Sequence, residues 1–220
     1  MPNWVDQDFH IVGKKADIDR FIRSGYVRRH PEQFDDLLFF DRLCPPPSPR
    51  KGRRKSLPAE APDLGVVLAH FRTRTQAMFS MQTRWDYPAD FYNRLLAHWP
   101  ELSFAASVNE EMGAFGGVIV IVDGEVIDAV RDYAQDYDRR SHVRAVRAAL
   151  KRWDGFLTGD RPWRLIPHCA WEHRSMPFDA HFDDDFWFYF RTREEMTGFR
   201  ERYRSARPQR REGKEWRRTR

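Results

Sequence analysis

The feature that most constrains the fold is the run Val118-Ile119-Val120-Ile121-Val122, which is followed directly by Asp123-Gly124. Five consecutive β-branched residues favour an extended strand, and Asp-Gly is typical of two-residue hairpin turns. We therefore expect residues 118–122 and 125–127 to form a β-hairpin. The run is also the longest apolar stretch of the chain, far below the ~20 residues that span a bilayer, so we expect no membrane segment.

The segments before the hairpin alternate between strand and helix patterns. Strand patterns occupy residues 8–13, 37–40, 77–83 and 102–108, and helical apolar spacing occupies residues 15–24 and 88–99. The order is β-α-β-β-α-β followed by the hairpin. The predicted fold class is therefore α+β, with a ferredoxin-like split βαβ core, an added hairpin, a smaller C-terminal α/β unit and a basic tail.

The C-terminal part has its own pattern. Val143, Val146, Leu150 and Trp153 give a helical stripe, and residues 185–191 predict a strand that is apolar on both faces and central in a sheet. Thr192 and Glu195 form a capping box that begins a helix running to about residue 204.

Composition predicts how these elements divide into units. With 220 residues the chain can bury one sizeable core, or one core and a smaller unit. We expect a ferredoxin-like domain over 1–130, with a mobile loop over 45–63 that holds six prolines. A helix plus strand-helix unit follows over 131–204, and 205–220 is predicted to be a disordered basic tail.

Positive charge is concentrated in two segments. Residues 203–220 hold eight Arg or Lys and two acids, and residues 50–55 hold five Arg or Lys and no acid. These segments carry +6 and +5 and the whole chain carries +5, so the remainder carries −6. The isoelectric point near 9.4 therefore describes two basic appendages and does not argue for a basic folded body.

A third basic element lies on the predicted helix around residues 140–153. Its Arg and Lys residues fall at i, i+4, i+7 and i+11, beside the apolar stripe. Such a line can follow nucleic-acid phosphates, or it can be the solvated side of an amphipathic helix. Combined with the loop and the tail it predicts a phosphate footprint, whose contact residues are Arg53, Arg54, Arg140, Arg144, Arg147, Lys151, Arg210 and Arg211.

Two aromatic positions at strand ends have alternative interpretations. Arg84, Trp85 and Asp86 follow a predicted strand and precede a helix. Trp85 can pack the corner while Asp86 caps the helix, or the three residues can form a polar pair beside an aromatic platform for a ligand or partner. Trp4 can likewise cover the end of the core or take part in an interface.

Residues with catalytic or metal-binding chemistry are scattered. Glu110 and Glu111 are interpreted as a solvated strand end. His168, Cys169, His173, His181 and Asp183 to Asp185 include zinc-binding residue types, but not at the spacing of known zinc motifs. Nucleophile and phosphate-loop motifs are absent from the sequence, so we assign no catalytic residue, cofactor or metal. The two cysteines, Cys44 and Cys169, fit a reducing compartment, and we expect a cytoplasmic protein.

Three segments within residues 1 to about 128 form a recognisable set. They are Met1-Pro2-Asn3-Trp4 with Phe9, Ile11 and Gly13; Arg42-Leu43-Cys44-Pro45-Pro46-Pro47; and residues 79–88, continuing through Phe91, Leu95, residues 99–104 and Glu110-Glu111 to Phe115-Gly116-Gly117. In this order and spacing they resemble the YubB-type ferredoxin-like family. Val5 and Gln7 stand where the family often has Cys and Asn. The resemblance implies a ferredoxin-like fold and an association with plasmids and phages, and it lends no reaction.

These observations lead to three hypotheses about function. The first is a non-enzymatic binding module that contacts nucleic-acid phosphates without much sequence preference. The second is a protein-interaction or accessory factor of a mobile element, whose tail meets an acidic protein partner. The third is a metal-dependent enzyme that uses Glu110, Glu111 or the His168–Asp185 cluster.

Overall fold

The computed structural model describes residues 3–28, 36–46, 64–133, 137–157, 163–167, 188–202, 205–212 and 215–218. Of these, residues 163–167, 188–189, 200–202, 205–212 and 215–218 are described by their backbone alone. Arg53, Arg54 and most of the predicted mobile loop lie outside the described residues, as does the His168–Asp185 cluster.

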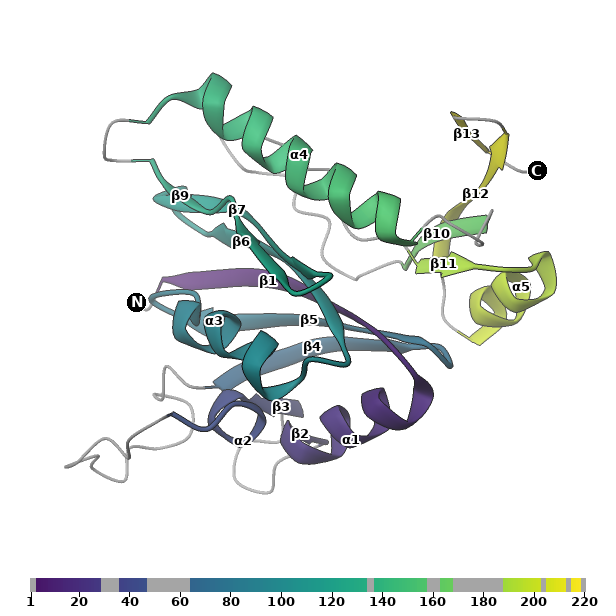
Figure 1. Ribbon diagram of the computed structural model, residues 1–220, viewed down its shortest axis with the longest axis horizontal. Coiled ribbons are helices and arrows are strands. Elements are labelled where there is room, and N and C mark those ends of the chain that lie inside the picture. Colours follow the sequence, from purple (N-terminus) through teal and green to yellow (C-terminus); the bar gives the residue numbers. More distant parts are fainter. Residues whose placement is uncertain are drawn as a thin grey trace.

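An antiparallel sheet of nine strands forms the centre of the described chain (Figure 1). Its order is β2-β3-β4-β5-β1-β6-β7-β8, and β9 also pairs with β7. The strands are β1 (Trp4–Val12), β2 (Tyr26–Val27), β3 (Asp36–Phe39), β4 (Leu64–Arg72), β5 (Gln76–Arg84), β6 (Ser103–Glu110), β7 (Phe115–Val122), β8 (Glu125–Asp128) and β9 (Arg131–Asp132). The α+β class is therefore confirmed.

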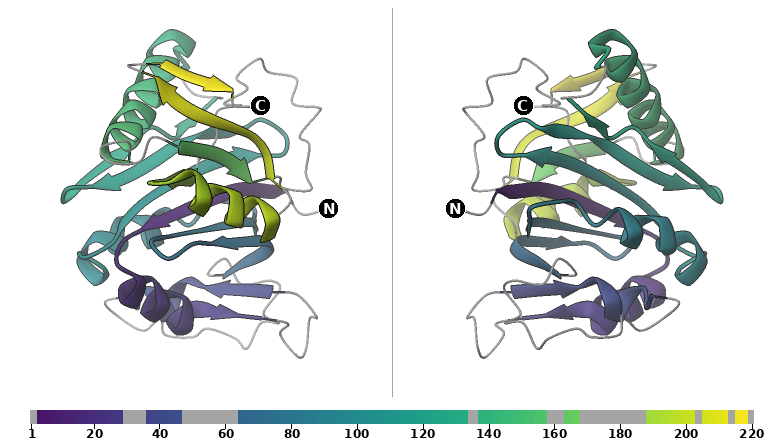
Figure 2. Two further views of the ribbon diagram at one scale, coloured as in Figure 1. Left: turned by 90° about the vertical axis from the view of Figure 1, so that its right-hand side faces the viewer. Right: turned by 90° about the vertical axis from the view of Figure 1, so that its left-hand side faces the viewer.

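Helices cover both faces of this sheet. α1 (Lys15–Gly25), α2 (Phe40–Leu43) and α3 (Ala89–His98) share a core with one face, and α4 (Arg139–Leu157) lies on the other. In both views of Figure 2 the strands separate α4 from α1 and α3. α5 (Arg193–Arg202) contributes side chains to the core on the α4 side.

The side chains of β7 pack against the helices on both faces of the sheet. Ile119 and Ile121 belong to the core beneath α1 and α3, whereas Val118, Val120 and Val122 belong to the core beneath α4. Successive side chains of a strand point to opposite faces, so a strand covered on both faces must be apolar at every position. The unbroken apolar run thus reflects two layers of helices.

The predicted hairpin is confirmed. Asp123 and Gly124 have φ angles of 53° and 77°, and positive φ at both central positions is the signature of the type I′ turn that Asp-Gly favours. At the other end of β7, Gly117 has φ of 145°, and a Cβ there would lie 2.2 Å from the carbonyl oxygen of Ala129. Only glycine fits this close approach.

In the first half of the chain the structure differs from the sequence-based prediction at two places. The strand β4, which lies between β3 and β5, was not predicted; Gly65 and a register shift between Val67 and Ala69 interrupt its alternation. Residue 40 was predicted as strand, but β3 ends at Phe39 and Phe40 begins α2. Its ring then packs on Phe91 of α3, with the centroids 4.5 Å apart.

The C-terminal strands form a second sheet, in the order β11-β10-β12-β13. They are β10 (Trp163–Pro167), β11 (Phe188–Phe190), β12 (Ser205–Glu212) and β13 (Glu215–Arg218). The prediction of a central strand at 185–191 is wrong, because β11 is the edge strand of the described sheet. The tail, predicted to be disordered, instead pairs as β12 with β10 and as β13 with β12.

The junction near residue 130 does not separate two cores. Trp153 of α4 and Phe190, Met196 and Phe199 of the C-terminal part are buried in the same cluster as Val120 of β7. Half of the capping box predicted at α5 is present: the amide of Glu195 donates to Thr192 Oγ1 at 3.2 Å, but the Glu195 carboxylate accepts from the amide of Arg191, at 3.1 Å, and not from that of Thr192.

Candidate nucleic-acid interface

α4 lies with one side against the large sheet. Its buried residues repeat every three or four positions along the helix: His142, Val146, Ala149, Trp153 and Leu157. The predicted stripe was slightly rotated, since Val143 and Leu150 are only half-buried and His142 takes part instead. Because the sheet occupies this side, the opposite side of α4 faces outward.

The predicted basic line occupies that outward side. Arg140, Arg144, Arg147 and Lys151 are all exposed. At 1.5 Å per residue the line is about 16 Å long, which spans several phosphates of a nucleic-acid strand. Two further exposed cations, Arg139 and Arg152, neighbour its first and last residues, each about 100° around the helix from the line. They were not predicted as contacts, although their charges are plain in the sequence.

The N-terminus of α4 has an unfavourable charge arrangement for a helix. Arg139 and Arg140 stand in the first turn, which holds no acidic residue, although the positive end of the helix dipole repels cations. The Asp138 carboxylate compensates by accepting from the Arg140 amide at 3.0 Å and from the Ser141 hydroxyl at 2.6 Å. The Ser141 hydroxyl and then the Arg140 amide lower the pKa of Asp138.

Contacts at both ends hold α4 in place. The His142 ring bridges Ala129 O, 3.0 Å from Nε2, and the Tyr137 hydroxyl, 3.1 Å from Nδ1. Burial lowers the pKa of His142, which favours the neutral ring in this position. At the far end Arg152 pairs with Asp123 of the β7–β8 turn at 2.8 Å. The basic line is therefore carried by a fixed element.

Few acids offset these charges. α4 holds six Arg or Lys and one carboxylate, Asp154. Among the residues that the structure describes, no carboxylate forms an ion pair with Arg140, Arg147 or Lys151. The outer face of α4 is thus a largely uncompensated positive surface.

The remaining predicted contact residues are described only in part. Arg53 and Arg54 lie outside the described residues, so their relation to α4 stays a prediction. Arg210 and Arg211 lie on β12, where Arg210 is in register with Arg217 of β13 and with Trp163 of β10. Figure 1 shows this small sheet next to the C-terminal end of α4.

The Arg84-Trp85-Asp86 segment is not the packed corner that one interpretation predicts. Trp85 is 64% exposed, and its φ is 69°, in the left-handed region. Asp86 accepts from the Tyr87 amide at 2.8 Å, and no side chain caps α3, whose N-cap residue is Pro88. The capping role assigned to Asp86 is therefore wrong, while Arg84 lies over the ring of Trp4, 5.1 Å from its centroid.

The contacts of the acidic and thiol candidates indicate a role in the fold and not in catalysis. Glu110 was predicted to be solvated, but it is 2% exposed, and one carboxylate oxygen accepts from the Met112 and Ala114 amides at 2.9 and 2.8 Å. Burial raises the pKa of Cys44 to about 12, so this thiol is not activated. Among the described residues no three His, Cys, Asp or Glu side chains could hold a metal ion together.

Comparison with known proteins gives no relative: no family model, no curated protein and no solved structure matches this chain. The resemblance to the YubB-type family therefore stays a prediction. Within the described segments, no helix is both long and apolar enough to cross a membrane.

Proposed function

We propose that this protein is a non-enzymatic module that binds nucleic acid through its phosphates. The observation that carries the proposal is the outer face of α4, where four exposed cations form one line on a helix anchored at both ends. Arginine guanidinium groups match phosphate oxygens in a two-pronged geometry, and lysine adds point charge. A rigid line of this kind reduces the ordering cost of binding.

The charge placement on α4 supports a role in binding over one in helix stability. Cations in the first turn of a helix cost roughly 0.3–1 kcal/mol each. Arg139 and Arg140 occupy that turn, and the last turn, where cations would be favourable, holds none. A surface that only needed to be solvated would gain stability from the opposite arrangement.

Contact through phosphates fits a binding mode without much sequence preference. Phosphate contacts position a protein on nucleic acid, whereas sequence is read by groups that reach base edges. The outer line of α4 offers Arg and Lys side chains, and the basic residues of 50–55 and of 205–220 are the proposed additional contacts. Binding is expected to fall steeply with salt.

The test is fluorescence anisotropy with single-stranded DNA, duplex DNA and RNA over a series of salt concentrations. Replacing the four line residues with Gln should remove up to four phosphate contacts, which lowers the slope of log affinity against log salt by about 3 to 4 on duplex DNA. The matched control removes four exposed cations elsewhere: Lys14, Arg28, Arg42 and Arg193. An equal effect of both variants would reduce the proposal to net charge, and no binding at low salt would end it.

We also propose that the fold is a ferredoxin-like split βαβ core related to the YubB-type family. The strand order β6-β1-β5-β4, with α1 following β1 and α3 following β5, supports this assignment. The second strand of the core would then be β4, and β2, β3 and α2 would be an insertion before it.

A second function, protein interaction, is favoured by a separate observation. Trp85 and Met112, 64% and 69% exposed, lie at the same end of the sheet, on either side of the start of β1. The left-handed backbone of Trp85 costs roughly 1–2 kcal/mol, and such strain is concentrated at functional sites. Tryptophan is also among the residues enriched in interface hot spots.

The two functions can be separated by nuclease treatment. Partners captured by the full chain after nuclease treatment, and lost with Trp85→Ala, would support an accessory factor. The same Trp85→Ala variant should leave the salt dependence of nucleic-acid binding unchanged. Capture that depends on the α4 cations and disappears with nuclease would instead support the leading proposal.

A further inference from the structure

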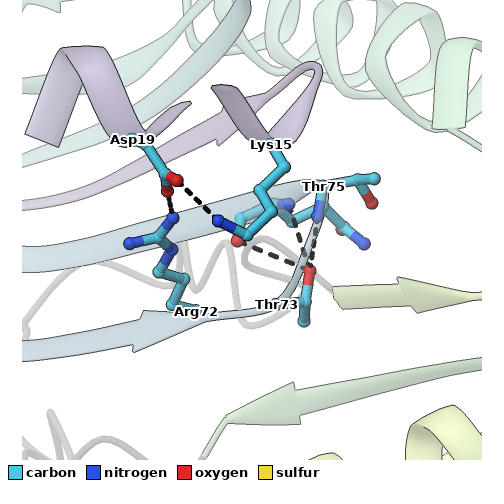
Figure 3. A network of polar contacts seen from close by, with 6 residues as sticks. Lys15, Asp19, Arg72, Thr73 and Thr75 are labelled. Atoms are coloured by element: carbon cyan, nitrogen blue, oxygen red, sulfur yellow. Dashed lines mark hydrogen bonds and ion pairs between the residues drawn. The ribbon is translucent and has the colours of Figure 1, made fainter. Parts of the chain in front are cut away.

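A second concentration of positive charge lies away from α4, where the tip of the β4–β5 hairpin meets α1. The two elements enclose an open hollow of about 580 Å³. Lys15 and Arg23 line it from α1, and Arg72 and Arg74 line it from the hairpin. The Thr73 hydroxyl lies at the same wall (Figure 3).

One carboxylate, Asp19, holds two of the cations of this hollow in place but does not neutralise its positive charge. Asp19 accepts from Lys15 Nζ at 2.6 Å through one oxygen and pairs with the Arg72 guanidinium through the other. Figure 3 shows both cations directed to Asp19, Lys15 from the same helix and Arg72 from β4. Four cations therefore face a single carboxylate. Arg23 and Arg74 are exposed, and neither forms an ion pair with a carboxylate within the described part of the chain.

The hairpin tip that carries these cations is fixed by its own hydrogen bonds. Thr73 Oγ1 accepts from the amides of Gln76 and Thr75 at 3.0 and 3.3 Å. The Thr75 carbonyl accepts from the Gly13 amide, at 3.1 Å, two residues before α1 begins. The two walls of the hollow are therefore joined through the backbone, and a ligand would meet preplaced charges.

From this geometry we infer that the hollow binds a phosphomonoester, such as the terminal phosphate of a nucleic-acid strand or the phosphate of a free nucleotide. A terminal phosphate carries about −1.5 to −2 charge at neutral pH and presents three acceptor oxygens. Converging cations in a concave site match such a group, whereas the convex line on α4 matches the singly charged phosphates of a continuous backbone. The inference stands on residues that the α4 proposal does not use.

The experiment compares one single strand in three forms: with a 5′-hydroxyl, a 5′-phosphate or a 3′-phosphate. Anisotropy with the full chain should show about tenfold tighter binding of a phosphate-ended strand than of the hydroxyl form. The double variant Arg23→Gln/Arg74→Gln should abolish this difference and leave the affinity for the hydroxyl form unchanged. Both residues are exposed, so the thermal unfolding midpoint should fall by no more than about 4 °C, the amount expected from losing the favourable Arg23 charge in the last turn of α1. Arg193→Gln serves as the control because it lines neither this hollow nor its neighbour.

Calorimetry with inorganic phosphate and with a nucleoside monophosphate separates the two sources of the ligand. Binding of either, lost in the double variant, assigns the hollow to a free phosphate compound. A preference confined to phosphate-ended strands assigns it to strand ends. Equal affinity for all three strand forms with no binding of the small phosphates overturns the inference. The α4 variant should weaken all strand forms equally, so failure of one proposal leaves the other measurable.

Discussion

The helices α1 and α4 cover opposite faces of the same sheet, and they use their charges in opposite ways. In its first turn α1 balances the cation Lys15 with an acid, Asp17, and in its last turn it has a base, Arg23, which the helix dipole favours. Two of its cations are paired, Lys15 with Asp19 and Arg20 with both Asp17 and Glu101. On α4 the first turn is basic, and most cations have no carboxylate partner among the described residues.

The inner sides of the two helices do not differ in this way. Phe21 of α1 and Trp153 of α4 are both almost fully buried against the sheet. Both helices therefore need an apolar inner side to pack on the sheet, and only their outward sides are free to bind a partner. A charge pattern that does not help its own helix is therefore a better indication of binding than the number of charges.

The largest expected effect is the loss of stability when a buried aromatic residue on the inner side of either helix is truncated. Trp153→Ala and Phe21→Ala should each lower the free energy of unfolding by about 3–5 kcal/mol, because both leave a cavity in a closed core. Chemical denaturation measures this, with Arg147→Ala as a surface control expected to change stability by less than about 0.5 kcal/mol. A loss below about 1 kcal/mol for Trp153→Ala would show that α4 is not part of the shared core.

Acid should weaken the α1 side of the sheet through His70. This ring stacks on Phe79, 4.4 Å between centroids, and burial lowers its pKa to about 4. An exposed histidine titrates near 6.5, so between about pH 6.5 and 4 the unfolded chain binds a proton that the folded chain does not. This contribution is fully present above pH 6.5 and falls by up to about 3 kcal/mol toward pH 4.

His70→Phe should flatten that pH dependence and retain the ring stack. Its Nε2 is buried without a partner among the described residues, so an apolar ring should be tolerated. The measurement is the unfolding free energy from pH 7 to pH 4 for both proteins. An unchanged slope would assign the acid sensitivity to other groups, of which His142 on the α4 side is the first to examine.

A smaller effect should distinguish the outer side of α4, which we expect to affect binding, from that of α1, which we expect to affect stability. Arg144→Gln/Arg147→Gln should weaken nucleic-acid binding about tenfold near physiological salt without a measurable loss of stability. Arg20→Gln, which breaks ion pairs on α1, should do the reverse and lower stability by up to about 1 kcal/mol while binding is kept. Parallel anisotropy and denaturation of both variants check this, and equal binding losses would remove the contrast.

The smallest effect concerns the helix dipole. Arg139→Glu places an acid where α4 has a cation and should raise stability by about 0.3–1 kcal/mol while weakening nucleic-acid binding. Asp17→Lys, the mirrored change on α1, should lower stability by a similar amount. Thermal unfolding at low salt measures both, and a destabilised Arg139→Glu variant would contradict the charge argument.

Much of the fold followed from local patterns. The strands β1, β5, β6 and β7 and the helices α1, α3 and α4 were predicted from apolar periodicity, and Asp123-Gly124 marked the hairpin turn. Prediction failed where a pattern was interrupted, as at Gly65 in β4, or where an apolar strand became an edge, as in β11. Pairing partners decide these cases, and they are distant in the sequence.

Of the candidate binding surfaces, likewise, one could be predicted from a local pattern and the others could not. The cation line of α4 could be predicted because both the cations and the apolar stripe that orients them repeat on one helix. The hollow beside α1 could not, since Lys15 and Arg72 are 57 positions apart and meet only through the sheet and Asp19. The exposure of Trp85 was not decided locally either, because its neighbours allowed both a packed corner and an aromatic platform.

Local sequence patterns sufficed to predict the α+β class, the hairpin of β7 and β8, and the charged outer side of α4, because each depends on residues close together in the chain. Three features depend instead on contacts between distant segments. α4 and α5 share a core with the large sheet, Glu110 is buried, and four cations from α1 and a hairpin meet around one carboxylate. Periodicity specifies which side of an element is apolar. The burial of long-range partners specifies what that side meets, and no local pattern carries that information.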